Sequence, residues 1–173
     1  MHRPMTSTTV NLDRLALSHG EGKRLDVPLR PDDLDLGGQR YSPRPQKVSG
    51  RLDVSRPSGG FAFRLRFPVS LEGPCMRCLE PAAVTVEIDA REVDQPIAGD
   101  DDLRSPYVDE GELDVSGWAH DAVALALPAQ ILCRPDCAGL CPVCGKDLNA
   151  EPHEHVEERL DPRWEKLSQL RQE

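Results

Sequence analysis

Cysteine and histidine residues gather in one short stretch near the C-terminal end of the chain. Four of the six cysteines and two of the five histidines lie between Cys133 and His155, in the sequence CRPDCAGLCPVCGKDLNAEPHEH. Packing alone gives no reason for this density, whereas thiolates and imidazoles are the side chains that bind zinc. The other two cysteines lie far upstream, as Cys75 and Cys78 in a C-x-x-C pair. The chain therefore offers enough soft and borderline ligands to close two tetrahedral zinc sites.

The cysteine pairs differ in how strongly their spacing indicates metal binding. In Cys141-Pro-Val-Cys144-Gly145 the two-residue separation directs both sulfur atoms at one ion, and the glycine permits a positive φ where the turn needs one. The upstream C-x-x-C pair lacks this glycine, and Cys133 and Cys137 are separated by three residues, so both pairs are weaker signals. The two histidines that follow the strongest pair are favoured as its remaining ligands.

The preferred assignment is two zinc ions in two separate sites. The first site has four thiolates, from Cys75, Cys78, Cys133 and Cys137, and the second has two thiolates and two imidazoles, from Cys141, Cys144, His153 and His155. Four thiolates around Zn²⁺ leave a net charge of about -2, which Arg77 and Arg134 beside the cysteines can offset. A crossed pairing, in which the two C-x-x-C pairs share one zinc as in a zinc ribbon, remains open.

Other uses of the cysteines are less favoured. The chain has no apolar stretch long enough to cross a bilayer and no secretory signal at its start, so we expect a cytoplasmic protein without membrane contact. Metal thiolates are favoured over disulfides in that reducing compartment. A redox C-x-x-C needs a thiolate of low pKa at the start of a helix, but Cys75 and Cys78 lie in strand-rich sequence. A zinc hydrolase needs an open coordination position, which the predicted sites do not leave, so we expect no catalytic residues and no small-molecule substrate.

The middle of the chain carries the clearest strand pattern. Between Phe61 and Leu71 apolar residues alternate with polar ones, which places all three phenylalanines on one face. Residues 48–54 and 82–90 alternate in the same way, so the pattern predicts a three-stranded antiparallel meander. Its second turn, residues 73–81, contains the first cysteine pair. Residues 24–29 predict a half-buried edge strand.

The remaining segments predict helices and connections. Apolar residues recur at helical spacing from Val115 to Ala126, and this helix, capped by Asp114 or Ser116, should cover the sheet. We also predict a short helix over residues 10–17, a loop over 32–45, an exposed connection over 95–114 and a C-terminal helix from Asp161, with Trp164, Leu167 and Leu170 as its apolar stripe. His19 and His120 have no second ligand near them and are not counted as metal ligands.

These elements predict the α+β class, with an antiparallel β-meander covered by a helix, a zinc-stapled Cys-rich segment and a short C-terminal helix. The expected organisation is a flexible N-terminus (1–9), an α+β core domain (10–130), and a Cys/His zinc-binding segment with the C-terminal helix packed on the core (131–173). The chain has 173 residues, of which 38% are hydrophobic and only 4% aromatic. A core of this composition is modest and gains from metal staples.

The net charge of -9 conceals an asymmetry between the two halves. Residues 1–80 carry 13 Lys/Arg against 9 Asp/Glu, whereas residues 81–173 carry 8 against 21. The predicted alternation puts Arg64 and Arg66 on the face opposite the phenylalanines, with Arg51 beside them, and we predict an RNA contact there. A solvated strand face is the plain alternative. The acidic half would instead suit a basic protein.

The sequence resembles the YceD family of bacterial large ribosomal RNA subunit accumulation proteins. The resemblance rests on LPAQILCRPDCAGLCPVCGKDLN from Leu127 to Asn149, on CMRCLEP from Cys75 to Pro81, and on DPRWEKL from Asp161. Cysteine-rich members often have C-x-C where this chain has His153-Glu-His155, a change that keeps two zinc-competent ligands. The resemblance implies a role in accumulation of the large-subunit (23S) ribosomal RNA, hence in ribosome biogenesis, with no established enzymatic activity. The expected partner is the large-subunit ribosomal RNA precursor or a basic ribosomal protein.

Overall fold

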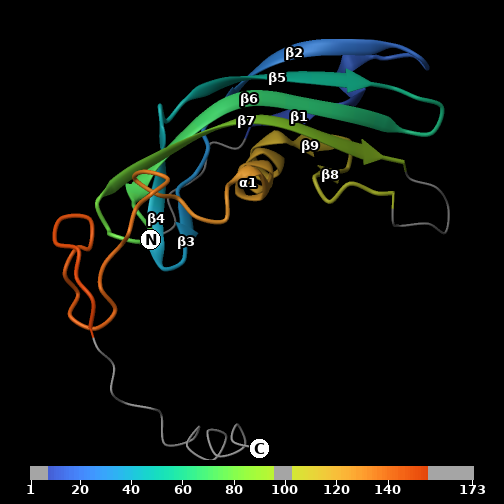
Figure 1. The fold of residues 1–173 in the computed structure, drawn as a ribbon. Helices are drawn as coiled ribbons and strands as arrows, with labels where there is room; N and C mark the ends of the chain where they lie inside the picture. The colour runs from blue at the N-terminus through green and yellow to red at the C-terminus, as the bar shows by residue number, and fades with distance from the viewer. Residues whose placement is uncertain (1–7, 96–102, 156–173) are drawn as a thin grey trace, which may run out of the picture.

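In the computed structural model, which describes residues 8–95 and 103–155, antiparallel strands dominate the fold (Figure 1). The described strands form a curved six-stranded sheet in which β6 (Phe61–Pro74) is central. One side of β6 pairs along its whole length with β7 (Pro81–Asp94). The other side pairs first with β5 (Val48–Ser55) and then with β4 (Gln39–Arg44). The sheet is completed by β2 (Gly22–Leu29) beside β5 and β3 (Leu34–Leu36) beside β4.

A second, smaller layer covers the hollow side of this sheet. Three short strands pair in the order β1 (Thr9–Asn11), β9 (Glu112–Asp114) and β8 (Val108–Asp109). Directly after β9 follows α1 (Val115–Ala126), whose N-terminal amides of Ser116 and Gly117 donate to the Asp114 carboxylate. Figure 1 shows α1 lying within the curve of the large sheet. The helix buries Trp118 edge-on against Phe63, with ring centroids 6.4 Å apart.

The antiparallel meander and the covering helix predicted from sequence are confirmed. Strands β5, β6 and β7 follow one another through short turns, and the apolar residues of β6 from Phe63 to Leu71 are buried, while Arg64 and Arg66 lie on the opposite face. The predicted edge strand is β2, which pairs within the described residues with β5 alone. The alternation is readable because one face of each strand is packed and the other is solvated.

Three segments differ from their predictions. Residues 10–17 contain strand β1 and a 3₁₀ helix (Asp13–Leu15) in place of an α-helix, because Val10 pairs with the distant Leu113. The loop predicted over residues 32–45 contains β3 and β4, which bury Tyr41 completely. The exposed connection predicted over residues 95–114 contains β8 and β9 and buries Leu113. Four of these strands have three residues or fewer, and β1 and β4 pair with partners that are remote in sequence, so no local pattern marks them.

Some predictions concern residues whose structure is not described. The C-terminal helix from Asp161 lies outside the described residues, as do residues 1–7 of the predicted flexible N-terminus. Thr9, which belongs to that predicted flexible start, lies in β1. Within residues 8–95 and 103–155, no helix is long and apolar enough to cross a membrane.

Gly73 allows β4 to approach β6 beside the first cysteine pair. Its missing side chain leaves room for the buried Tyr41 ring, and the Tyr41 hydroxyl donates to the Pro74 carbonyl at 2.8 Å. A methyl group at Gly73 would overlap that ring and lie 2.8 Å from the Arg40 carbonyl oxygen.

We therefore expect Gly73→Ala to destabilise the protein by about 1–3 kcal/mol, the usual cost of overpacking a filled core. The measurement is urea unfolding at fixed metal concentration. Gly59→Ala is the matched control, because nothing lies within 4 Å of the added methyl group. Equal stability of the two variants would contradict the packing described for Tyr41.

Candidate metal centres

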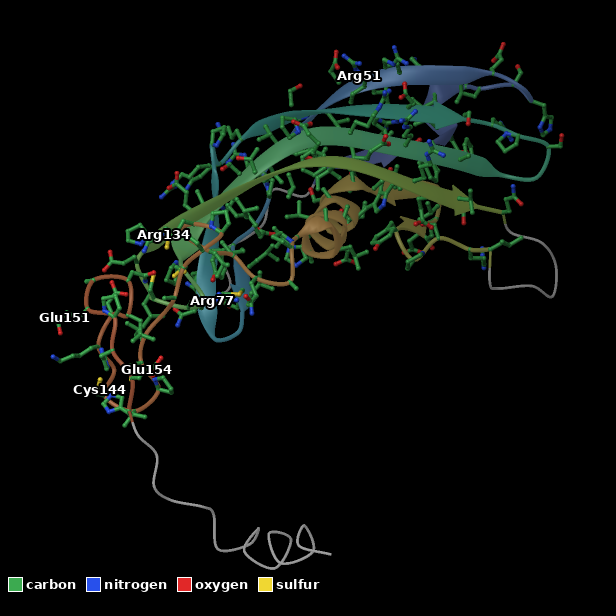
Figure 2. All side chains as sticks on the ribbon, viewed as in Figure 1. Arg51, Arg77, Arg134, Cys144, Glu151 and Glu154 are labelled. Atoms are coloured by element: carbon green, nitrogen blue, oxygen red, sulfur yellow. The ribbon has the colours of Figure 1, made fainter. Side chains whose placement is uncertain are left out.

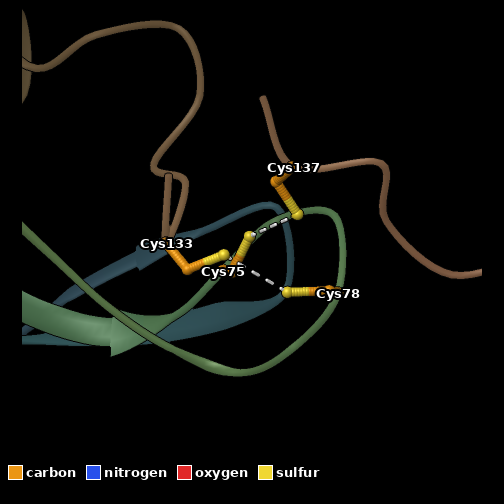
Figure 3. Close-up of side chains that lie close together, drawn as sticks. All are labelled: Cys75, Cys78, Cys133 and Cys137. Carbon is orange, nitrogen blue, oxygen red and sulfur yellow. Dashed lines mark hydrogen bonds between the residues drawn. The ribbon is translucent and has the colours of Figure 1, made fainter. Parts of the chain in front are cut away.

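Four thiols that are far apart in sequence meet at the end of the β6–β7 hairpin (Figure 3). Cys75 and Cys78 come from the hairpin turn, and Cys133 and Cys137 come from the segment after α1. The Sγ atoms of Cys75 and Cys137 are 3.8 Å apart, and those of Cys78 and Cys133 are 3.6 Å apart. Sulfurs bound tetrahedrally to zinc at about 2.3 Å are separated by about 3.8 Å. A disulfide would need about 2.05 Å, so the spacing fits a metal centre.

Backbone hydrogen bonds hold the two contributing segments together. The amide of Met76 donates to the Ile131 carbonyl at 2.9 Å, and the amide of Leu140 donates to the Arg77 carbonyl at 3.0 Å. Ile131 itself is buried, with 1% of its surface exposed. The loop that carries Cys133 and Cys137 is thus fixed to the hairpin at both of its ends. We call the four thiols of Cys75, Cys78, Cys133 and Cys137 the four-thiol cluster.

The four-thiol cluster is largely enclosed by the hydrophobic core. Cys75, Cys78 and Cys137 are buried, and Cys133 alone among the four is exposed. The Arg77 amide lies 3.5 Å from the Cys75 sulfur, and the Asn149 side-chain amide lies 3.6 Å from the Cys137 sulfur. Such N–H groups stabilise thiolates and orient metal ligands. Both flanking arginines lie beside the cluster (Figure 2). Arg77 donates to the Cys137 carbonyl at 3.0 Å, whereas the Arg134 guanidinium lies 3.4 Å from a carboxylate oxygen of Asp136, so charge compensation of the cluster fits Arg77 better.

The pKa values of Cys75 and Cys78 shift in opposite directions. Burial raises the pKa of Cys75, but backbone N–H groups outweigh it and lower the pKa to about 6. A backbone hydrogen bond at Glu80 lowers the pKa of Cys78, yet burial and the neighbouring thiols raise it to about 12. One thiolate therefore opposes ionisation of the next, and a cation bound among them removes this opposition.

The second cluster lies in the terminal loops of the described chain. Cys141, Cys144, His153 and His155 offer ligand atoms that all lie within 4.8 Å of one another, and we call them the mixed thiol–imidazole cluster. The Cys144 sulfur is 3.1 Å from Nε2 of His153. The other ring nitrogen of His153, Nδ1, lies 2.7 Å from the Glu151 carbonyl oxygen. Donation from Nδ1 leaves the Nε2 lone pair directed at the cluster, as in histidine ligands of zinc.

The mixed thiol–imidazole cluster is far more exposed than the four-thiol cluster. Cys141 is buried, whereas Cys144 and His155 are exposed, and Figure 2 shows Cys144 in a loop well away from the sheet. Backbone N–H groups of Cys144 and Val143 lower the pKa of Cys141 to about 6 despite its burial. The Glu151 carbonyl and Cys141 raise the pKa of His153.

The structure brings the eight predicted ligands together in the two sets preferred from the sequence, not in the crossed arrangement. His19 and His120 belong to neither cluster. Asn149, whose side-chain oxygen holds the loop beside the four-thiol cluster, was missed by the sequence analysis. This oxygen accepts hydrogen bonds from the Arg134 guanidinium at 2.7 Å and from the Ala138 amide at 2.8 Å. Nothing in the residue types signals this role, because it depends on how the loop folds.

The two C-x-x-C turns share one backbone pattern. In the first, the Leu79 amide donates to the Cys75 carbonyl and the Cys75 amide to the Glu80 carbonyl. In the second, the Gly145 amide donates to the Cys141 carbonyl and the Cys141 amide to the Lys146 carbonyl. The residue after the second cysteine has φ 66° at Leu79 and φ 73° at Gly145. Leucine therefore occupies a left-handed position that glycine fills in the other turn.

The three arginines predicted to bind RNA also lie together, on the convex face of the large sheet. Arg51 is directly opposite Arg66 in the register, and Figure 2 shows Arg51 on the side away from α1. Arg64 donates to both carboxylate oxygens of Asp89, at 2.6 and 2.5 Å. Arg66 lies 2.5 Å from a carboxylate oxygen of Asp53. Arg51 forms no ion pair within the described residues.

The fold and the two clusters define an antiparallel β-protein with one covering helix and two side-chain groups positioned to hold metal ions. The chain belongs to the YceD family: residues 63–171 match the family described as large ribosomal RNA subunit accumulation protein YceD. This match includes both candidate metal centres and the whole of β7 and α1.

Several curated proteins are similar to parts of the chain. An uncharacterized protein of Mycobacterium tuberculosis (strain ATCC 25618 / H37Rv) is 39% identical over 106 residues, which are 57% of this chain and 49% of that protein. An uncharacterized protein of Mycobacterium leprae (strain TN) is 33% identical over 102 residues, 56% and 46% of the two chains. A Zea mays protein, large ribosomal RNA subunit accumulation protein YCED homolog 1, chloroplastic, is 40% identical over 60 residues, 35% and 20%. The matches thus span about half the length of the mycobacterial relatives or less. No solved structure matches the chain.

A matched pair of substitutions, Leu79→Gly and Gly145→Ala, tests the left-handed conformation after the second cysteine of each turn. Leu79 is 53% exposed, so Leu79→Gly loses little burial and removes the strain of a branched residue at positive φ. We expect Leu79→Gly to leave stability unchanged or raise it by about 1 kcal/mol, and Gly145→Ala to weaken its turn by about 1 kcal/mol. Chelator competition for bound metal, followed with a colorimetric indicator, measures both effects. Weaker metal retention in Leu79→Gly would contradict the strained conformation.

Proposed function

We propose that the chain is a non-enzymatic ribosome assembly factor that supports accumulation and processing of the large-subunit (23S) ribosomal RNA. The observation that carries this proposal is the family match over residues 63–171, because the family is described as a large ribosomal RNA subunit accumulation protein. A relative from maize carries the same description in its name. The proposal concerns the role of the whole protein and is inferred from the role of the family.

Two zinc ions per chain form part of the proposal. Thiolate and imidazole sets in closed, roughly tetrahedral groups suit zinc better than magnesium or calcium, which prefer oxygen ligands. The four-thiol cluster would hold one ion and the mixed thiol–imidazole cluster the other. With four protein ligands each, the sites have no open position for substrate or water, which supports a structural role over a catalytic one.

The proposed RNA contact uses Arg51, Arg64 and Arg66 on the convex face. The strand register puts the three arginines on one face, where Arg51 is exposed and the side chains of Arg64 and Arg66 are half-buried. Phosphate oxygens could reach guanidinium groups there. Hydrogen bonds from Arg24 hold the pKa of Asp53 below its ordinary value, and Arg64 does the same for the pKa of Asp89. Both carboxylates are therefore ionised at neutral pH and compete with phosphate for Arg64 and Arg66. A contact of this kind is weak unless the RNA displaces them.

This ion pairing favours a second candidate function. The chain would act as an acidic binding partner or chaperone of a basic ribosomal protein, which would support ribosomal RNA accumulation indirectly. Residues 81–173 carry 21 Asp/Glu against 8 Lys/Arg, a balance that suits a basic partner. Both candidates place the chain in assembly of the large subunit and differ in the molecule that it contacts.

Two sets of substitutions on the convex face test the RNA contact, one expected to raise the affinity for RNA and the other to lower it. Asp53→Asn with Asp89→Asn frees Arg64 and Arg66, so affinity for a large-subunit RNA precursor should rise. Replacing Arg51, Arg64 and Arg66 by glutamate should lower it. The salt slope should change by about 0.7–0.9 in log K per log unit of salt for each phosphate group that a variant newly binds or releases. Filter binding at several salt concentrations measures both.

Arg104→Glu is the control for a single charge reversal outside the large sheet, and it is compared with Arg51→Glu alone, which makes the same charge change on the convex face. If both sets of variants bind the precursor as wild type does, the convex face makes no RNA contact. Loss of association on neutralising the acids between residues 100 and 114 would then support the basic-protein alternative.

A further inference from the structure

Strand β7 presents an unusually long open edge. All fourteen of its residues pair with β6, and within the described residues its outer edge has no neighbouring strand. The main chain of β7 also makes no other hydrogen bond along residues 82–94 in the described structure. A long unpaired edge is a template for pairing with another chain.

The register shows which main-chain groups face outward. The Cys75 amide donates to the Glu80 carbonyl, which makes these two residues a hydrogen-bonded pair. Along the antiparallel hairpin, hydrogen-bonded pairs alternate with non-hydrogen-bonded pairs, so the next pair, Pro74 with Pro81, is non-hydrogen-bonded. Pro68, which has no N–H, lies opposite Glu87 in another non-bonded pair, as this alternation requires. The outward N–H and C=O groups therefore belong to Ala83, Thr85, Glu87, Asp89, Arg91 and Val93. All six of these residues are exposed.

A cavity of about 350 Å³ opens beside this edge, between β7 and α1. Its walls are apolar where Ile88 and Ala90 of β7 face Trp118 and Leu125 of α1. Leu125 is 87% exposed, the largest value among the exposed large hydrophobic residues of the described structure. A side chain that enters the cavity would therefore cover apolar surface that is otherwise in contact with water.

The same cavity carries negative charge. Glu92 from β7 and Asp121 from α1 line it, and neither forms an ion pair within the described residues. Asp121 accepts from the Tyr107 hydroxyl at 2.8 Å. Burial raises the pKa of Tyr107 to about 12, with smaller contributions from the hydrogen bond to Asp121 and from the charges of Asp121 and Glu92. Asp89 also lines the cavity, and Arg91 is its one cationic lining residue among those described.

We propose that the β7 edge and this cavity bind an extended basic segment of a partner protein by strand addition. The partner's main chain would pair with the outward groups of β7, and its alternate side chains would point toward α1. Lysine or arginine would meet Asp121 and Glu92, and an aliphatic residue would pack on Leu125 and Trp118. The acids disfavour RNA phosphates, and a second copy of the chain would bring the same acids against them.

The identity of the partner as a ribosomal protein rests on the proposed function. The binding of a basic strand at this edge does not depend on that function. The probe is therefore free of ribosomal components: a fluorescein-labelled decapeptide of alternating lysine and valine. Fluorescence anisotropy measures its affinity for the zinc-loaded chain. An alternating glutamate and valine peptide should bind much more weakly. The lysine peptide with alternate amides N-methylated keeps its charge but loses the main-chain donors of one edge, and should also bind weakly.

Two substitutions at one position separate strand addition from simple charge attraction. Arg91→Ala removes a positive charge beside the cavity and keeps the outward N–H, so the lysine peptide should bind as tightly as to wild type or more tightly. Arg91→Pro removes the same charge and also the N–H, a change that edge strands tolerate. Its affinity should be about tenfold lower than that of Arg91→Ala, which corresponds to about 1.4 kcal/mol. Circular dichroism checks that both variants fold.

A charge reversal tests the cavity itself. Asp121→Lys should weaken binding of the lysine peptide, while Asp35→Lys on the distant β3 should leave it unchanged. Equal affinities of Arg91→Ala and Arg91→Pro would overturn strand addition. Displacement of the peptide by single-stranded RNA, or concentration-dependent dimerisation through β7 in sedimentation velocity, would overturn the basic-strand assignment. Failure of the peptide assay leaves the proposed role in ribosomal RNA accumulation standing, because the assay contains no ribosomal component.

Discussion

The convergence of four cysteines at the end of the β6–β7 hairpin is the constraint on which the arrangement of the C-terminal region depends. Cys78 and Cys133 are 55 positions apart in the chain, yet their sulfur atoms lie 3.6 Å apart. A metal ion that joins them closes a long loop and lowers the conformational entropy of the unfolded chain, as a disulfide would. The chain has few aromatic residues for its core, so such a link would add stability that packing alone does not supply.

Charge is distributed differently over the two faces of the large sheet. The segment after α1 is hydrogen-bonded to the end of the β6–β7 hairpin, and this attachment holds the C-terminal end of α1 on the hollow side of the sheet. The convex face is left to charged residues that pair across strands, such as Arg66 with Asp53. The acids Glu92 and Asp121 near α1 lack such ion pairs within the described residues. The two faces therefore differ in what they can bind. On the convex face Arg64 and Arg66 are paired with acids, whereas the face near α1 keeps uncompensated negative charge beside an open strand edge.

The parts of the fold that could be predicted from the sequence are those whose patterns are local. The alternation from Phe61 to Leu71 predicted a strand that the structure contains, and the helical spacing after Asp114 predicted α1. The preferred grouping of the candidate ligands rested on the place of the histidines after the strongest cysteine pair and on the arginines beside the other cysteines, and the structure brings the same two sets together. Strands β1, β3, β8 and β9 were missed because three or fewer residues carry no periodicity. The ion pairs of Arg64 and Arg66 were also missed, since Asp89 lies 25 positions from Arg64 and the relation exists only in the register.

The most direct test of the central claim is X-ray absorption at the zinc edge on the Cys141→Ser, Cys144→Ser double variant. This variant keeps every thiol of the four-thiol cluster and removes both thiols of the mixed thiol–imidazole cluster. We expect one tightly held zinc with four sulfur neighbours at about 2.3 Å and no nitrogen or oxygen in its coordination shell. A shell that contains nitrogen or oxygen, or a variant that retains no zinc, would contradict the claim that Cys75, Cys78, Cys133 and Cys137 form one metal centre.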